Sequence, residues 1–207
     1  MAKTIPMIIT NSDILVKEKD SDEFKAFQLP SIQDIPNIPF YHIFAERIAE
    51  SQYYFKEFMK ELYGKKLSKY ILAIIVPDDT SKLESIFINE FFVNSGACKA
   101  VAQMPMALAL SKEDNNYISI SKSQRNVILE YIKDREIIVK KQYNADTCTP
   151  MQILRDAKVV HIDVEYDDIP VYVNNFNLNM DDYLEMGEII GKKRFLQKIA
   201  QIDVEKL

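Results

Sequence analysis

Glycine is scarce in this chain. Its 207 residues include four glycines, roughly a quarter to a third of what an average usage of about 7% predicts. Backbone that wraps around phosphate groups needs glycine, because glycine alone combines a positive φ angle with close approach to a ligand. The scarcity therefore disfavours a glycine-rich phosphate-binding loop.

Cysteine and histidine are rare as well, and long apolar runs are absent. The two cysteines, Cys98 and Cys148, lie far apart in the sequence, which fits a reduced cytosolic protein. The two histidines, His42 and His161, lack the ligand spacing of a zinc site. No apolar run approaches the ~20 residues that span a bilayer, and the first residues lack the pattern of a signal peptide. We therefore expect a cytoplasmic protein with no direct membrane span and no metal site.

The charge balance is slightly acidic. Lysine and arginine number 26 and aspartate and glutamate 31, which gives a formal net charge of -5. A nucleic-acid-binding protein would need a basic face, and the local lysine clusters have acids interleaved with them. We interpret those clusters as solvated surface and expect no nucleic-acid partner.

The first half of the chain predicts an α/β unit. Three short strands in succession are typical of an antiparallel meander, and the continuous apolar run that follows later suits a strand buried on both faces. Ser81 and Glu84 match a capping box at a helix start. The predicted elements are strands at 7–10, 13–17 and 24–29, a helix at 40–63, a strand at 70–76, a helix from 81 to the stop at Gly96, a strand at 100–104 and a short helical segment at 106–110.

The second half repeats this order approximately. A polar segment at 111–116 is interpreted as a linker, after which a second meander begins. Thr149 and Pro150 predict a helix start. The predicted elements are strands at 117–121, 126–132 and 137–143, a helix of about ten residues from 149, strands at 159–164 and 170–174, and a mostly helical segment at 180–202 that is interrupted or bent near Gly187 and Gly191.

The stretch from Tyr70 to Leu110 carries the most specific pattern. Its segments Val76–Asp79, Ser95–Ala97 and Met104–Ala107 resemble the strand–proline turn, the helix end and the Glu-Pro-Met-Ala-Ala segment of the bacterial actin MreB. The whole layout is similar to that of the actin-like ATPase superfamily, which includes MreB, FtsA and PilM and is built from two ribonuclease H-like lobes. The resemblance implies an α/β, actin-like duplicated ribonuclease H-like fold in minimal form, with lobes at residues 1–112 and 113–207.

The resemblance also implies where phosphate hairpins would lie. In this superfamily each begins with a pattern such as Asp-x-Gly-x-x-x-Thr, whose glycines let backbone amides cradle phosphate. The counterparts here are 9–13 and 118–124, and the adenosine-side motif corresponds to 175–179; none contains glycine. Ser119 stands at the aspartate position of the second hairpin.

These departures predict a degenerate member of the superfamily. We expect a non-catalytic pseudo-ATPase scaffold or assembly partner that is not an enzyme, holds no cofactor, and binds a protein partner or self-associates. The alternative is a nucleotide-binding switch or ATPase that uses ATP and magnesium. Its anion would meet Ser119, Ser121, Lys122, Ser123 and Gln124, which otherwise form a polar hairpin in solvent. A small α/β domain unrelated to actin is a third possibility.

Two weaker patterns leave alternatives open. The acidic residues Asp163, Glu165, Asp167 and Asp168 could bind a divalent cation or form an exposed strand edge and turn. Aromatic residues at 53–55 and 91–92 lie on both sides of their predicted helices. One face must be core, and the other is either an interaction surface or packs against the neighbouring lobe.

Overall fold

The chain forms two compact units. The computed structural model describes residues 3–29, 38–110 and 115–202, and the units are Met1–Met104 with Leu196–Leu207, and Pro105–Phe195. The predicted lobe boundary between residues 112 and 113 lies outside the described residues. Within the described ranges, no helix is both long and apolar enough to cross a bilayer.

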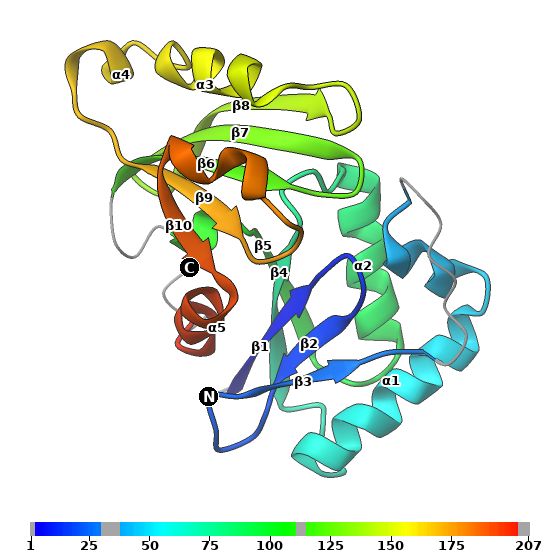
Figure 1. The fold of residues 1–207 in the computed structure, drawn as a ribbon. Coiled ribbons are helices and arrows are strands. Elements are labelled where there is room, and N and C mark those ends of the chain that lie inside the picture. The colour runs from blue at the N-terminus through cyan, green and yellow to red at the C-terminus, as the bar shows by residue number, and fades with distance from the viewer. Residues whose placement is uncertain (1–2, 30–37, 111–114, 203–207) are drawn as a thin grey trace. The chain divides into compact units, whose positions relative to one another are not determined.

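A five-stranded sheet in the order β3-β2-β1-β4-β5 forms the centre of the first unit (Figure 1). The first three strands form the predicted antiparallel meander, and β4 lies parallel to β1 with Met7 beside Ile74. Nearly all of β4 is buried, as its continuous apolar sequence predicts. The strands are β1 Lys3–Ile9, β2 Ile14–Lys17, β3 Phe24–Phe27, β4 Tyr70–Val76 and β5 Ala100–Pro105.

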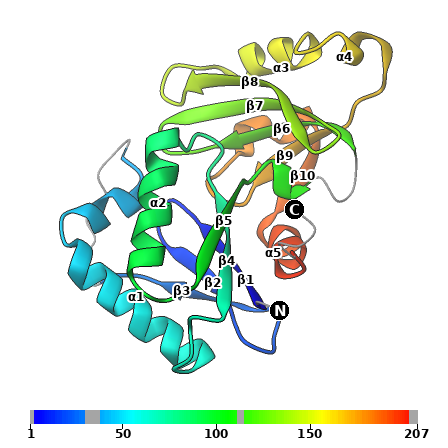
Figure 2. The ribbon, with the colours of Figure 1, turned by 180° about the vertical axis from the view of Figure 1, so that it is seen from behind.

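Helices α1 (Ile48–Tyr63) and α2 (Lys82–Asn94) lie side by side over one face of this sheet, as Figure 2 shows. Aromatic rings fill the space between them: Phe55 packs edge-on against Phe92 with ring centroids 4.8 Å apart. The single helix predicted from residue 40 is wrong, because the chain forms a 3-10 helix, η1 (Phe40–Ala45), before α1 begins. Arg47 has non-helical backbone angles at this junction.

The predicted capping box of α2 is confirmed. The Ser81 hydroxyl accepts a hydrogen bond from the Glu84 amide at 3.2 Å, and the Glu84 carboxylate accepts one from the Ser81 amide at 2.7 Å. The other carboxylate oxygen of Glu84 lies 2.9 Å from Nε2 of His42 in η1. The start of α2 is thereby fixed by its own cap and tied to the segment before α1.

The second unit repeats the strand order of the first. Its sheet runs β8-β7-β6-β9-β10, with an antiparallel meander β6-β7-β8 and β9 parallel to β6. The correspondence confirms the predicted duplication. The elements are η2 Leu108–Leu110, β6 Asn116–Lys122, β7 Asn126–Lys133, β8 Glu136–Asn144, α3 Pro150–Lys158, α4 Asp163–Tyr166, β9 Val171–Asn175, η3 Asp181–Met186, β10 Glu188–Gly191 and α5 Lys192–Ala200, in which the boundary between the units falls.

Two predicted elements of this half are wrong. The alternating segment 159–164 is a turn that leads into α4, because Asp163 is engaged by β7 rather than paired in a ladder. The mostly helical segment predicted at 180–202 is wrong in its middle, because the interruption near Gly187 and Gly191 is a strand, β10, which pairs parallel with β9. Gly187 precedes β10 at a close approach: a Cβ atom there would lie 2.2 Å from the carbonyl oxygen of Val171. The glycine therefore allows β10 to join the sheet.

Substituting Ser81 with alanine tests the cap. We expect Ser81→Ala to lower the free energy of unfolding by about 1 kcal/mol, because the first turn of α2 loses the acceptor for its Glu84 amide. Urea unfolding followed by circular dichroism measures the change. Ser68→Ala, at an exposed serine between α1 and β4, is the control and should lie within about 0.5 kcal/mol of the wild type. Equal effects of the two substitutions would show that the Ser81 hydroxyl does not stabilise the helix.

Candidate functional site

The five candidate residues occupy the end of β6 and the turn after it. Ser119, Ser121 and Lys122 belong to β6, and Ser123 and Gln124 lie before β7. Since successive side chains of a strand point to opposite faces, Ser119 and Ser121 share one face of the second sheet and Lys122 lies on the other.

The face that carries Ser119 is unusually polar for a buried surface. Ser119 lies opposite Glu130 of β7, which in turn lies opposite Lys140 of β8. On its other side β6 pairs with β9, and extending that register by one residue places Asn174 beside Ser121. We call Ser119, Ser121, Glu130, Lys140 and Asn174 the polar row.

The opposite face of the same sheet is the apolar core of the unit. Ile120 and Leu129 pack there with Val173 and with Ile153 of α3. The second sheet therefore has one apolar face, while its other face combines the polar row with the buried side chains of Tyr117, Ile128 and Tyr172.

Two members of the polar row have hydrogen-bonding capacity that the described chain does not use. Ser119 is 1% exposed and its hydroxyl has no hydrogen-bond partner; Asn174 is 2% exposed and its amide nitrogen has none. The amide oxygen of Asn174 accepts from the Phe176 backbone at 3.2 Å, which fixes the orientation of the side chain. Leaving a buried polar group unpaired costs about 1–3 kcal/mol. Such groups are therefore typical of places that receive a ligand, an ion or ordered water.

The charges of the row are paired with each other. Glu130 is fully buried, and its carboxylate lies 3.2 Å from the ammonium group of the more exposed Lys140. A buried carboxylate needs such a partner because its desolvation is costly. Among the members of the row, Ser119 and Asn174 are then the ones with unused donors.

The turn that follows β6 is closed by a serine hydroxyl. Ser123 Oγ accepts hydrogen bonds from the amides of Arg125 at 3.1 Å and Asn126 at 3.0 Å, and the Ser123 amide donates to the Asn126 carbonyl oxygen at 2.8 Å. In a glycine-rich phosphate loop, turn amides of this kind point at the ligand. Here the Ser123 hydroxyl occupies them, so an anion at this hairpin would have to be held by side chains.

The equivalent turn of the first unit has the same geometry. Thr10 Oγ1 accepts from the amides of Ser12 at 3.2 Å and Asp13 at 3.0 Å, and the Thr10 amide donates to the Asp13 carbonyl oxygen at 3.0 Å. Thr10 and Ser123 each follow directly after the first strand of their unit. The duplication thus extends to the hydrogen bonds of the hairpins, which the sequence did not reveal.

Sequence reasoning missed Asn174. It assigned the adenosine-side motif to 175–179, where Asn175 accepts a hydrogen bond from the Met180 amide at 3.1 Å and holds the loop after β9. Asn174 lies one residue earlier, inside the strand, and only the pairing of β9 with β6 brings it beside the serines.

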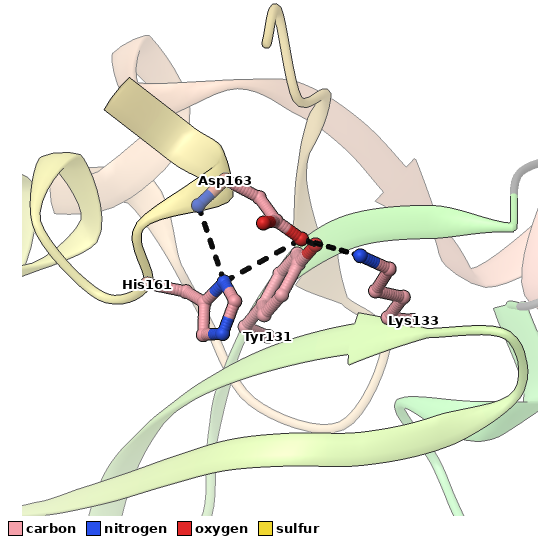
Figure 3. Close-up of polar contacts among 4 residues, drawn as sticks. All are labelled: Tyr131, Lys133, His161 and Asp163. Atoms are coloured by element: carbon pink, nitrogen blue, oxygen red, sulfur yellow. Dashed lines mark hydrogen bonds and ion pairs between the residues drawn. The ribbon is translucent and has the colours of Figure 1, made fainter. Parts of the chain in front are cut away.

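A second polar cluster fixes α4 to β7 (Figure 3). The buried hydroxyl of Tyr131 and the ammonium group of Lys133 both donate to Oδ2 of Asp163, at 2.8 Å and 2.7 Å. The ring of His161 stacks on Tyr131 at 4.8 Å, and its Nδ1 accepts from the Asp163 amide at 3.2 Å. Tyr143 of β8 likewise donates to Asp156 of α3 at 2.8 Å.

These contacts account for Asp163, one of the four residues of the acidic run. Asp163 is an anchor for the helical layer, and the described residues contain no group of three or more potential metal ligands. Burial, and then the hydrogen bond to Asp163, raise the pKa of Tyr131 to about 12. Hydrogen bonds from Lys133 and Tyr131 hold the pKa of Asp163 below its usual range.

Comparison with known proteins gives similarity of structure but not of sequence. No family model and no curated protein matches the chain. The AlfA filament bound to AMPPNP is similar with a TM-score of 0.52 and 10% identity, over 97% of this chain and 95% of that one. The inorganic polyphosphate/ATP-glucomannokinase of Arthrobacter sp. strain KM has a TM-score of 0.53 and 11% identity, over 97% of both chains. The cytoplasmic domain of EpsL, an inner-membrane component of the type II secretion system of Vibrio cholerae, has a TM-score of 0.50 and 9% identity, over 96% of this chain and 93% of that one.

At such identities the likeness shows the fold alone: this chain has the actin-like α/β fold. The prediction that it is not an enzyme is wrong, because the structures with this fold include a kinase. The prediction failed because the absence of glycine from the hairpins was interpreted as a loss of activity. Its absence from the hairpins removes a backbone cradle, but it does not remove side-chain donors such as those of the polar row.

The anchor at Tyr131 predicts a specific pH dependence. The pKa of Tyr131 in the folded state is about 12, above the ordinary tyrosine value of 10.0. The contribution of this group to stability is therefore complete below pH 10 and is lost as the pH rises towards 12. The stability difference between wild type and Tyr131→Phe should therefore shrink over that range. Urea unfolding at a series of pH values measures it.

Tyr53→Phe, at an exposed tyrosine of α1, is the control and should show no such change. If the difference in the free energy of unfolding between wild type and Tyr131→Phe is constant from pH 8 to about pH 12, folding does not raise the pKa of Tyr131.

Proposed function

We propose that this chain is an actin-like assembly protein whose second unit binds a nucleotide through the side chains of the polar row and of the adjoining hairpin. The observation that carries the proposal is the pair of unused donors, the Ser119 hydroxyl and the Asn174 amide, on one buried face of the second sheet. The likeness to an AlfA filament bound to AMPPNP supports it at the level of the fold.

The ligand would be held without a glycine-rich loop. Ser119 and Asn174 would donate to phosphate oxygens, with Ser121 between them on the same face. Hydrogen bonds to a charged acceptor are roughly twice as strong as neutral ones, which compensates for the missing turn amides. Gln124, in the turn after β6, would add a further polar contact. Lys122, at the end of β6 but on the opposite face, would contribute positive charge without touching the ligand, and magnesium would accompany the nucleotide.

The second part of the proposal is that this chain associates with another protein chain. The partner would be a second copy of the chain, and another protein is the alternative. AlfA forms filaments and EpsL is a component of a secretion system, so structures with this fold take part in both kinds of contact.

The substitution Ser119→Ala tests whether the Ser119 hydroxyl binds a ligand or stabilises the fold. Because the hydroxyl has no partner in the described chain, its removal should leave the ligand-free melting temperature unchanged or raise it. The same substitution should weaken magnesium–ATP binding by about tenfold, which is about 1.4 kcal/mol, as measured by calorimetric titration. Lys122→Glu should weaken binding as well, because it places negative charge at the hairpin.

Thr147→Ala, at an exposed turn residue of the same unit, is the control and should bind as the wild type does. Absence of heat and of a thermal shift with millimolar magnesium–ATP would contradict nucleotide binding, since a ligand of the folded state must raise its stability. A lower melting temperature of ligand-free Ser119→Ala would show that the hydroxyl is used within the fold.

Assembly is tested separately by sedimentation of the full chain over a range of concentrations, with and without magnesium–ATP. We expect the sedimentation coefficient to rise with concentration, because self-association follows mass action. A single monomeric species under every condition would contradict the assembly half and leave nucleotide binding to be judged by calorimetry.

A further inference from the structure

Helix α2 is apolar on both sides. Ile88, Phe91 and Phe92 face the core of the first unit and are buried. On the outer side Leu83 is 76% exposed, Ile86 53% and Val93 39%. Exposed apolar side chains that lie together among polar residues mark an interaction surface. We call Leu83, Ile86 and Val93 the outer stripe.

A cavity of about 290 Å³ lies beside the N-terminal half of the stripe. It is lined by His42, Ala45, Leu83, Glu84 and Phe87, and its wall is mostly hydrocarbon. The two polar groups in the lining, His42 and Glu84, bond to each other. A cavity of this kind suits an apolar side chain.

The charges along the stripe indicate which partner fits. Lys82 and Glu90 are both exposed and lie symmetrically about Ile86, one before it and one after it on the same helix. If two copies of α2 met in parallel about Ile86, lysine would face lysine and glutamate would face glutamate. In an antiparallel pair, Lys82 of each copy faces Glu90 of the other, which gives two ion pairs of opposite charge. The helix is therefore complementary to itself in one orientation.

We propose that α2 pairs antiparallel with α2 of a second copy of this chain, about a two-fold axis beside Ile86. Such an isologous contact, with the same surface on both subunits, is the commonest way in which identical chains associate. The C-terminal half of each helix then faces the cavity at the N-terminal half of the other, and Val93 is the apolar side chain that it presents. This surface deepens the assembly half of the proposed function and rests on it.

The contact should be weak on its own. One helix pair buries less than the ~1,200 Å² of a standard interface, so the dimer should form in a concentration-dependent way. Repetition of the contact along an assembly would strengthen it, since linked sites add avidity.

Sedimentation equilibrium of the full chain without nucleotide tests the contact. Wild type should show a monomer–dimer equilibrium, and Ile86→Asp should shift it to monomer. Lys82→Glu should weaken dimerisation by about tenfold, because four like charges then meet at the axis. The double variant Lys82→Glu/Glu90→Lys exchanges the charges and should restore the wild-type dissociation constant.

Met151→Asp, which changes an exposed apolar residue on α3 of the second unit, is the matched control and should dimerise as the wild type does. Circular dichroism of every variant confirms that it is folded. Failure of the double variant to recover would overturn the antiparallel pairing, and so would a wild type that stays monomeric. Unaltered dimerisation of Ile86→Asp would overturn this surface while the proposed assembly still stands.

Discussion

In each unit, a side-chain hydroxyl that accepts hydrogen bonds from two backbone amides closes the first hairpin. The kind of group that the candidate site can offer a ligand depends on this interaction. Thr10 and Ser123 make the same set of hydrogen bonds at equivalent places in the two meanders. A turn closed in this way needs no glycine, because the side chain supplies the acceptor that the amides require. The amides that bond to the hydroxyl are not available to phosphate, so the proposed nucleotide site would depend on side chains of the sheet. Ser119 and Asn174 have unused donors on that sheet.

The helical layers of the two units are held by different physical interactions. In the first, α1 and α2 meet through aromatic rings such as Phe55 and Phe92, whose packing does not depend on pH. In the second, the Tyr131 hydroxyl of β7 donates to Asp163 of α4 (Figure 3). The Tyr143 hydroxyl of β8 likewise donates to Asp156 of α3. The same tyrosine rings face the core, so each supplies apolar contact and a polar tie together. The first layer has one such tie as well, because the Tyr63 hydroxyl of α1 donates to the carbonyl oxygen of Lys17 in β2, so alkaline pH should weaken tyrosine ties in both units.

Much of the fold could be predicted from sequence, whereas the members of the candidate site that lie outside β6 and its turn could not. Local signals were sufficient for the capping box at Ser81 and for the apolar run of β4, since each depends on residues close together in the chain. The segment 159–164 was wrongly predicted as a strand, because apolar and polar residues can alternate both in a strand and in a turn whose side chains point in opposite directions. Asn174 was missed for a different reason. Its role depends on the parallel pairing of β9 with β6, and the chain between these strands gives no local sign of that register.

The few glycines of this chain lie mostly at positions where the backbone requires glycine. Gly64 and Gly96 end α1 and α2 with positive φ angles, and Gly187 admits the close approach to Val171, so the fold itself demands three of the four. Tight turns elsewhere use other residues: Asp134 and Arg135, between β7 and β8, both have positive φ angles. A residue with a Cβ atom pays roughly 1–2 kcal/mol for that conformation, which the long β7–β8 ladder offsets. In this hairpin, residues other than glycine therefore occupy turn positions that usually favour glycine. The missing glycines of the phosphate hairpins are thus part of a pattern that runs through the whole fold, and their absence alone says little about whether a ligand binds.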